Sequence, residues 1–185
     1  MYYIGIDNGP TGSIAALRKG IIEYYPMPVY QEQSYTKKAQ MTTHVDTQKL
    51  REILIKYIND PEGCMCLRER PFTGMFYKAV VSAARADEAT TIVLRELNMR
   101  SEYCDSRDWQ RKMLPQDMGK IITTKSGHQK RKVEPRELKE ASHDIACRLF
   151  PTARAWLLKT TKKGIKKIDG DSILIAEYCR RFIGD

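Results

Sequence analysis

The sequence predicts an α/β fold: a mixed five-stranded sheet whose first three strands are antiparallel, with helices on both of its faces. Three short apolar segments separated by turn residues open the chain, and two further strand segments then alternate with segments of helical periodicity. This order is typical of a sheet that is covered by helices on either side. The 185 residues, of which 42% are hydrophobic, suit a single domain spanning 1–185 with a core of its own.

The first part of the chain supplies the antiparallel strands. Turn residues at Asp7–Pro10 and a hairpin loop at Arg18–Gly20 separate the apolar segments. Gln31–Val45 is polar and irregular and is expected to be a surface loop. From Thr47 the apolar period changes to 3.6, which predicts a helix that ends before Asp60. The predicted strands are Tyr2–Ile6, Gly12–Leu17 and Ile21–Tyr25, and the helical stripe consists of Leu50, Ile53, Leu54, Tyr57 and Ile58.

The rest of the chain alternates strands with helices. A fourth strand must stop before Pro71, because proline has no N–H to donate to a neighbouring strand. Pro135 suits the first turn of a helix, where a backbone N–H would have no partner within the helix. Leu114–Val133 is expected to be a loop, and Leu174, Ile175, Tyr178 and Phe182 are expected to face inward from the last helix. The predicted strands are Cys64–Arg68 and Ser101–Cys104, and the predicted helices are Phe76–Leu97, Asp108–Met113, Pro135–Phe150 and Asp171–Ile183.

Positive charge is concentrated in one stretch of the chain. The formal net charge is +9, and residues 120–167 contain fourteen Lys and Arg side chains against four Asp and Glu, a local charge of +10. Two basic segments, 125–132 and 159–167, are expected to be loops and carry most of this charge. Such a footprint favours a polyphosphate partner, because binding releases the counterions of the phosphates. A solvated surface or a basic localisation signal are the alternatives.

Other classes of protein fit poorly. The chain has no apolar run of the roughly 18 residues that a membrane span needs. Met1–Asp7 has no basic region ahead of an apolar one, so we expect no signal peptide. The five cysteines show no spacing typical of zinc sites, and their odd number indicates reduced thiols in a cytosol-like compartment.

Acidic residues stand where strands end and where the last helix begins. Asp7 ends the first predicted strand, Glu69 ends the fourth, and Asp169 and Asp171 precede the last helix. If those two strands are neighbours, the carboxylates converge in one pocket, where each raises the pKa of the others. Mg²⁺ relieves this repulsion and prefers carboxylate oxygen. Each acid also has an ordinary explanation: Asp7 as a turn cap, Glu69 as a solvated strand end and Asp171 as a helix cap.

Six segments, taken in their order along the chain, form a recognisable set of motifs. They are residues 3–15 (YIGIDNGPTGSIA), 67–72 (LRERPF) and 169–178 (DGDSILIAEY), with Asp108-Trp109, residues 139–142 (KEAS) and residues 149–151 (LFP) between them. In these segments the chain resembles the RuvC-like Holliday junction resolvases, in the phage and plastid-type branch of the ribonuclease H-like superfamily, over almost its whole length. In two respects it departs from the pattern: Asp169 and Asp171 are closer in sequence than is usual, and Gln110 stands where a lysine is common.

The resemblance implies a ribonuclease H-like nuclease that resolves four-way DNA junctions by paired symmetric cuts. It implies Asp7, Glu69, Asp169 and Asp171 as ligands of two Mg²⁺ or Mn²⁺ ions per active site, with no organic cofactor. Lys139 falls where the family has a lysine near the scissile phosphate, and Phe72 where an aromatic residue inserts at the junction centre. A solvated lysine and a core phenylalanine are the alternatives. The remaining residues expected to contact DNA are Arg111, Lys112, Lys125, Lys130, Arg131, Lys132, Lys162, Lys163, Lys166 and Lys167.

Two symmetric cuts require two active sites, so a homodimer with two-fold symmetry is implied. The helix at Phe76–Leu97 is expected to form part of that interface, unless it only covers the sheet. Three other functions remain open. A phosphotransferase of the actin and sugar-kinase type begins similarly but needs two such domains. A related nuclease for other branched or hybrid nucleic acids, and a non-catalytic junction-binding module, also fit the residues.

Overall fold

The computed structural model describes residues 1–184 except 35–39, 72, 75, 124–128 and 162–163, and gives only the backbone for 121–123, 129–131 and 160. In this part of the chain the main sheet has five strands in the order β3-β2-β1-β6-β7. β1 pairs antiparallel with β2, and β2 with β3, whereas β1–β6 and β6–β7 are parallel. The predicted mixed sheet is therefore confirmed. Its strands are β1 (Tyr2–Asp7), β2 (Ser13–Arg18), β3 (Ile21–Pro26), β6 (Cys64–Glu69) and β7 (Ser101–Cys104).

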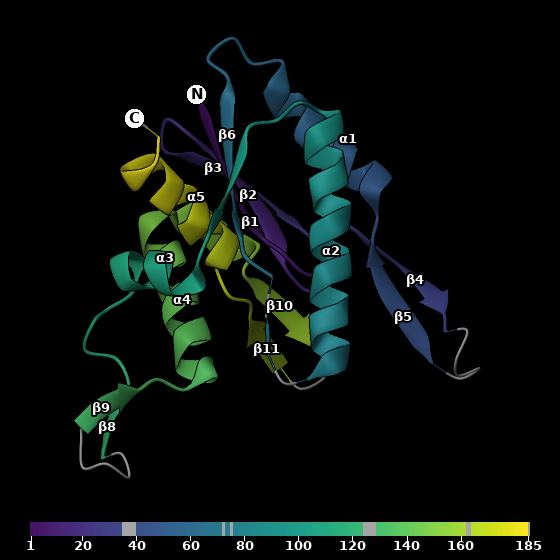
Figure 1. The fold of residues 1–185 in the computed structure, drawn as a ribbon. Coiled ribbons are helices and arrows are strands. Elements are labelled where there is room, and N and C mark those ends of the chain that lie inside the picture. Colours follow the sequence, from purple (N-terminus) through teal and green to yellow (C-terminus); the bar gives the residue numbers. More distant parts are fainter. Residues whose placement is uncertain (35–39, 72, 75, 124–128, 162–163, 185) are drawn as a thin grey trace.

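Helices cover both faces of the sheet, as expected (Figure 1). β2 is buried on both sides: Ile14 and Ala16 enter one core, and Ala15 and Leu17 enter the other. The first core is completed by α1 (Thr47–Ile58) and α2 (Tyr77–Glu96). The second is completed by α3 (Ser106–Met113), α4 (Pro135–Leu149) and α5 (Asp171–Phe182).

Local capping sets where the helices begin. Asp46 accepts a hydrogen bond of 3.1 Å from the Lys49 N–H at the start of α1, and Asp105 accepts one of 2.9 Å from the Arg107 N–H at the start of α3. α3 therefore begins two residues earlier than predicted. At the start of α4, Glu134 and Glu137 form a capping box around Pro135.

Strands occur where the sequence predicted loops. The described residues outside the main sheet include three antiparallel hairpins, and the expectations of a loop at Gln31–Val45, at Leu114–Val133 and at 159–167 were wrong where these hairpins have strands. Val29–Gln33 and Gly164–Lys167 are exposed along their whole length, so they lack the buried apolar face that identifies a half-buried strand. The hairpins are β4 (Val29–Gln33) with β5 (Met41–Val45), β8 (Lys120–Thr123) with β9 (Gln129–Lys132), and β10 (Leu158–Thr161) with β11 (Gly164–Lys167). In Figure 1 the β8–β9 hairpin lies at the lower left, the β4–β5 hairpin lies to the right of α2, and the β10–β11 hairpin lies between α4 and α2.

Close packing fixes α5 against the centre of the sheet. A Cβ atom at Gly5 of β1 would overlap the backbone of Ser172 and Ala176, so the helix approaches β1 as closely as a glycine allows. The last turn of α5 differs from the prediction: Phe182 is 49% exposed, because its ring packs on Tyr178 instead of entering the core. No helix in the described part of the chain is long and apolar enough to cross a bilayer.

Candidate metal centre

The pairing of β1 with β6 places two acids side by side. Ile6 pairs with Arg68 in parallel register, so Asp7 and Glu69 follow together at the carboxyl ends of the two central strands. Side chains alternate between the faces of a sheet. Ile6 and Arg68 point toward α2, and Asp7 and Glu69 point toward α5.

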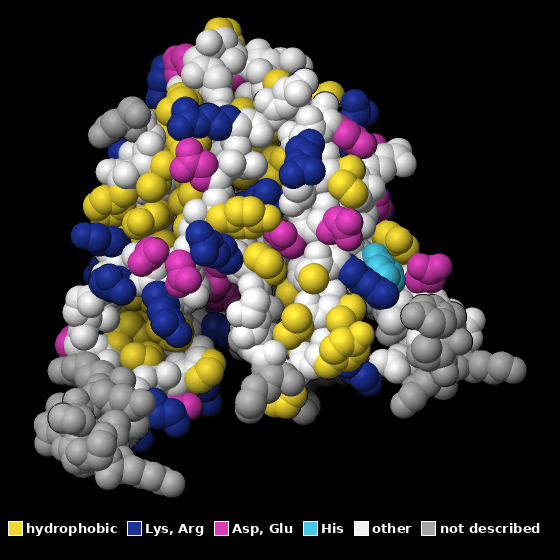
Figure 2. All heavy atoms as spheres, in the orientation of Figure 1, with side chains coloured by type: hydrophobic (Ala, Val, Ile, Leu, Met, Phe, Trp, Pro, Cys, Tyr) yellow, Lys and Arg dark blue, Asp and Glu magenta, His cyan; other side chains and the backbone are white. Residues whose placement is uncertain are grey.

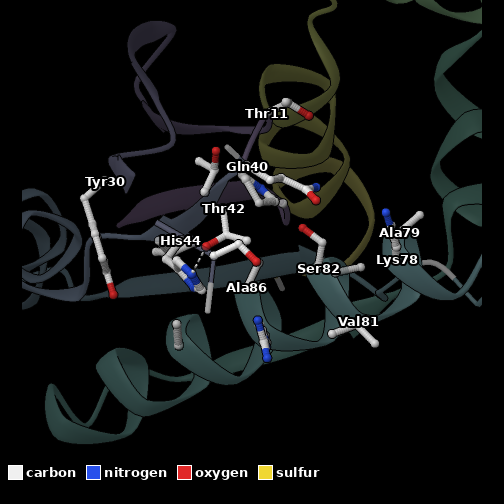
Figure 3. Close-up of a pocket in the computed structure, with 18 of the residues that line it drawn as sticks. Thr11, Tyr30, Gln40, Thr42, His44, Lys78, Ala79, Val81, Ser82 and Ala86 are labelled. Carbon is white, nitrogen blue, oxygen red and sulfur yellow. Dashed lines mark hydrogen bonds between the residues drawn. The ribbon is translucent and has the colours of Figure 1, made fainter. Parts of the chain in front are cut away.

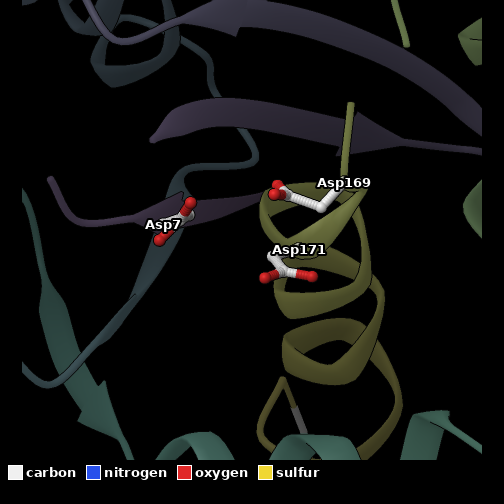
Figure 4. A group of neighbouring side chains, drawn as sticks. All are labelled: Asp7, Asp169 and Asp171. Atoms are coloured by element: carbon white, nitrogen blue, oxygen red, sulfur yellow. The ribbon is translucent and has the colours of Figure 1, made fainter. Parts of the chain in front are cut away.

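The beginning of α5 brings further carboxylates to the same place. One oxygen from each of Asp7, Asp169 and Asp171 lies within 4.8 Å of the others, although Asp169 and Asp171 are only two positions apart in the chain. Figure 4 shows Asp7 on β1 opposite the end of α5 that carries the other two. Glu69 does not belong to this group within 4.8 Å, but its charge acts on Asp7.

Neighbouring side chains hold the acids in place. Ser142 of α4 donates a hydrogen bond to Asp171 and accepts one of 3.1 Å from the Gly170 N–H. The indole N–H of Trp109, a fully buried residue, donates to Glu69 at 3.2 Å. The Lys139 ammonium group donates to Asp169 at 2.9 Å. The sequence singled out Ser142 and Trp109 as landmarks of a resemblance, and the structure places both against the acids.

The electrostatics of this cluster leave negative charge uncompensated. Burial raises the pKa of Asp7 well above its usual range, and the charges of Asp171, Glu69 and Asp169 raise it further. Burial is also the main reason that the pKa of Asp171 rises to about 6 and that of Glu69 to about 7. Lys139 lowers the pKa of Asp7 and Asp171, and its own pKa is raised by its hydrogen bond to Asp169. A hard divalent cation fits this set of oxygen donors.

A hydrogen-bond network on the opposite face of the sheet, which the sequence analysis missed, supports the strand ends. Asp87 of α2 accepts hydrogen bonds from the Asn8 amide at 2.6 Å and the Tyr103 hydroxyl at 2.7 Å, and it pairs with Arg68 at 3.4 Å. Thr90 donates to Asn8 at 3.0 Å. We call these residues (Asn8, Arg68, Asp87, Thr90 and Tyr103) the Asp87 network. Asn8 and Arg68 each neighbour an acid of the cluster in sequence, so the network anchors the backbone on which Asp7 and Glu69 stand.

The residues expected to contact DNA are spread over several elements. Lys139 lies at the cluster, but Lys112 lies 5.7 Å from the centre of the Phe182 ring, at the far end of α5. Lys132 pairs with Glu134 at 3.1 Å and Lys167 with Asp144 at 2.8 Å, whereas Arg111 and Lys166 are exposed. Figure 2 shows basic side chains dispersed among acids on the face in view. Phe72, Lys125, Lys162 and Lys163 lie outside the described residues, as do the side chains of Lys130 and Arg131.

Comparison with solved structures identifies the fold. The structure titled "T. thermophilus RuvC in complex with Holliday junction substrate" aligns with 98% of this chain and 96% of its own, at a TM-score of 0.53 and 9% identity. The chain has the RuvC fold. A second Thermus thermophilus RuvC structure aligns with 97% of this chain and 96% of its own, at a TM-score of 0.49 and 12% identity.

The RuvC fold confirms the ribonuclease H-like architecture that the sequence predicted. At 9% identity the likeness is one of fold. No family model matches the sequence, and no curated protein matches it. The function is therefore argued from the side chains of this chain's own site.

Proposed function

We propose that this protein is a metal-dependent endonuclease that resolves four-way DNA junctions by paired, symmetric hydrolysis of phosphodiester bonds. The observation that carries the proposal is the convergence of Asp7, Asp169 and Asp171 within 4.8 Å in a chain with the RuvC fold. The matched RuvC structure holds a Holliday junction, which supports branched DNA as the substrate. The high positive charge of the chain supports a polyanionic partner in general.

Mg²⁺ or Mn²⁺ ions are the cofactors that the acids would hold, two per active site. The donors would be Asp7, Asp169 and Asp171, joined by Glu69 from the neighbouring strand. A divalent cation bound there would lower the pKa of a water molecule and stabilise negative charge on the phosphate. Binding would also relieve the repulsion that raises the pKa of Asp7.

The surrounding side chains would orient the acids and the phosphate. Ser142 fixes the carboxylate of Asp171 by its hydrogen bond, and Trp109 fixes that of Glu69. Lys139 is 67% exposed, so its ammonium group can contact a phosphate while it remains next to Asp169. A cation in this position stabilises the charge that develops on the phosphate in the transition state.

Paired cuts on opposing strands would need a symmetric homodimer. The outer face of α2 carries exposed apolar side chains at Tyr77 and Ile92, and Phe76 just before the helix is also exposed. Apolar and aromatic side chains are typical of the buried centre of an interface. This supports α2 as part of the contact between protomers.

The test is a panel of labelled substrates: a four-way junction, a fork, an RNA–DNA hybrid and a linear duplex, each with and without Mg²⁺. We expect symmetric nicks in the junction, only with the metal present. Asp7→Asn and Asp171→Asn should still bind the junction but not cut it, while the exposed control Glu52→Gln on α1 should cut normally. Preferred cutting of the fork or hybrid would favour the related nuclease, and unchanged behaviour of Asp7→Asn would favour a binding module without catalysis.

A further inference from the structure

A groove of about 1000 Å³ lies between the β4–β5 hairpin and the amino-terminal half of α2, apart from the acidic cluster. In Figure 3, Thr42 and His44 of β5 lie across from Ser82 and Ala86 of α2. Gly9, Pro10 and Thr11 also line the groove. Nothing in the proposed chemistry uses this space.

The side chains that line the groove suit a chain of phosphates and bases. Lys78 and Arg85 contribute positive charge, and none of the described residues that line it is an Asp or Glu. Tyr30 and His44 are cross-strand partners whose rings stack with centres 5.5 Å apart, and a hydrogen bond of 3.1 Å joins His44 to Thr42. Tyr30 is 48% exposed, so part of its ring remains available for contact.

The α2 wall combines cations with small side chains. Lys78, Ser82, Arg85 and Ala89 recur every three or four residues, so they share one flank of the helix. Tyr77, which we assign to the protomer contact, also lines the groove, so the groove borders the proposed contact between protomers. Because Ser82 between the two cations and Ala89 beyond Arg85 are small, a DNA strand can lie close to the helix along this flank.

The groove adjoins the loop that carries the first acid. Gly9–Thr11 belong to the turn between β1 and β2, which begins directly after Asp7. The Gly12 N–H donates to the Gly9 carbonyl at 3.0 Å, and a Cβ atom at Gly12 would overlap the Asp7 carbonyl, so this turn folds tightly back on the acid. An occupant of the groove therefore touches the same turn that positions Asp7.

We propose that the groove binds an unpaired DNA strand, with a base stacked on Tyr30 and phosphates held by Lys78 and Arg85. An exposed ring beside cations is the arrangement that holds single strands, because a base that is paired and stacked within a duplex does not offer its face. This inference rests on the proposed function and extends it, since opened nucleotides near a junction are the strand that would enter.

Binding of a fluorescent twelve-residue oligothymidine, measured by anisotropy in EDTA, tests the groove apart from catalysis. Tyr30→Ala should weaken binding about 5- to 150-fold, the range that loss of one base stack gives, whereas Tyr30→Phe should stay within about twofold. Each phosphate contact on a single strand adds about 0.7 to the slope of log K against log salt. The double variant Lys78→Gln and Arg85→Gln should therefore lower the slope by about 1.4, and Arg95→Gln, an exposed cation elsewhere on α2, should not change it.

The results of the binding and cutting assays distinguish the groove proposal from the nuclease proposal. If Tyr30→Ala and the double variant bind the oligothymidine as the wild type does, the groove proposal is overturned, even when the wild type cuts junctions. If those variants lose binding while the wild type leaves every branched substrate intact, the nuclease proposal fails and the groove stands. Equal loss in Tyr30→Phe and Tyr30→Ala would also overturn the stacking role of the ring.

Discussion

The Lys139 ammonium nitrogen on α4 lies 2.9 Å from Asp169 Oδ2, just ahead of α5. This ion pair joins two elements that are about thirty residues apart and gives the acidic cluster its neighbouring positive charge. Lys139 also remains 67% exposed, so the same charge faces solvent from which DNA would approach. We expect its main effect to be on the rate of cutting rather than on stability, because exposed ion pairs add little to stability.

Lys139→Met should lower the single-turnover rate of junction cutting by about 10²- to 10³-fold, the usual cost of losing one group that stabilises transition-state charge. Junction binding in Ca²⁺ should stay within about twofold, and Lys139→Arg should keep part of the rate because it keeps the charge. Arg51→Met removes an exposed cation from α1, which packs on the other face of the sheet, and serves as the control. Wild-type cutting by Lys139→Met would show that this lysine is only a surface residue.

The metal-free protein should lose stability as pH rises. Asp171 and Glu69 have folded-state pKa values of about 6 and about 7, above the roughly 4 of an unfolded carboxyl group. The folded state therefore binds these two protons more tightly than the unfolded state does. Their contribution to the free energy of unfolding is complete below about pH 4 and is lost as pH rises through about 7. In EDTA, the free energy of unfolding of Asp171→Asn should equal that of the wild type near pH 4 and should be about 1–3 kcal/mol higher at pH 8. Urea unfolding at the two pH values measures this difference.

Mg²⁺ should reverse this difference. Because a ligand that binds the folded state stabilises it, the melting temperature of the wild type should rise with Mg²⁺ at pH 8. The melting temperature of Asp171→Asn should rise much less with Mg²⁺, since this variant lacks one of the proposed carboxylate ligands. If Mg²⁺ raises the melting temperature of Asp171→Asn as much as that of the wild type, Asp171 is not a metal ligand.

Gly5→Ala should destabilise the fold. The added methyl group would overlap the backbone of Ser172 and Ala176, and moving α5 away from β1 is costly because both elements belong to the core. Overpacking of this kind costs about 1–3 kcal/mol or more, and each kcal/mol lowers the melting temperature of a chain of this size by about 2–4 °C. Gly9→Ala, where a Cβ atom has open space, should change stability by less than about 0.5 kcal/mol. Equal melting temperatures for the two variants would contradict the close packing of α5.

Asp87→Ala should be among the most destabilising substitutions of a charged residue. Arg68 is only 5% exposed, and loss of its acidic partner would leave a buried charge unpaired, at a cost of about 3–5 kcal/mol. Asp87→Asn keeps one hydrogen-bond acceptor and should cost less. Glu88→Ala, on the exposed side of the same helix, is the matched control and should be nearly neutral by urea unfolding. Similar stability of Asp87→Ala and Glu88→Ala would mean that Asn8 and Arg68 are held by other contacts.

Apolar patterning predicted the elements of the main sheet because their side chains alternate or recur with the period of the structure. Strand β7 was predicted with its observed bounds, and α5 to within one residue at its end. The same criterion failed for the β4–β5 hairpin, where Tyr30 and His44 stabilise each other by a cross-strand contact that apolar periodicity does not reveal. Phe182 was misplaced because its spacing along α5 fits the inward face, although the last turn lies at the surface.

Position at element ends was enough to single out Asp7, Glu69, Asp169 and Asp171, since strand ends and helix starts are where functional side chains gather. That Asp169 lies within 4.8 Å of the others could not be predicted, because it depends on how closely α5 approaches β1. Asp87 was missed for a different reason. In the sequence, an acid in the middle of a helix cannot be told from a solvated surface residue. Its contacts with Asn8 and Arg68 are formed only in the folded structure.

The parallel pairing of Ile6 with Arg68 limits where the chain can change its length. One residue inserted or deleted within β1 or β6 would turn the following acid to the wrong side of the sheet. The β8–β9 hairpin lies outside the main sheet, so a change of length there does not shift this register. The fold should therefore tolerate insertions outside the five-stranded sheet far better than insertions within β1 or β6.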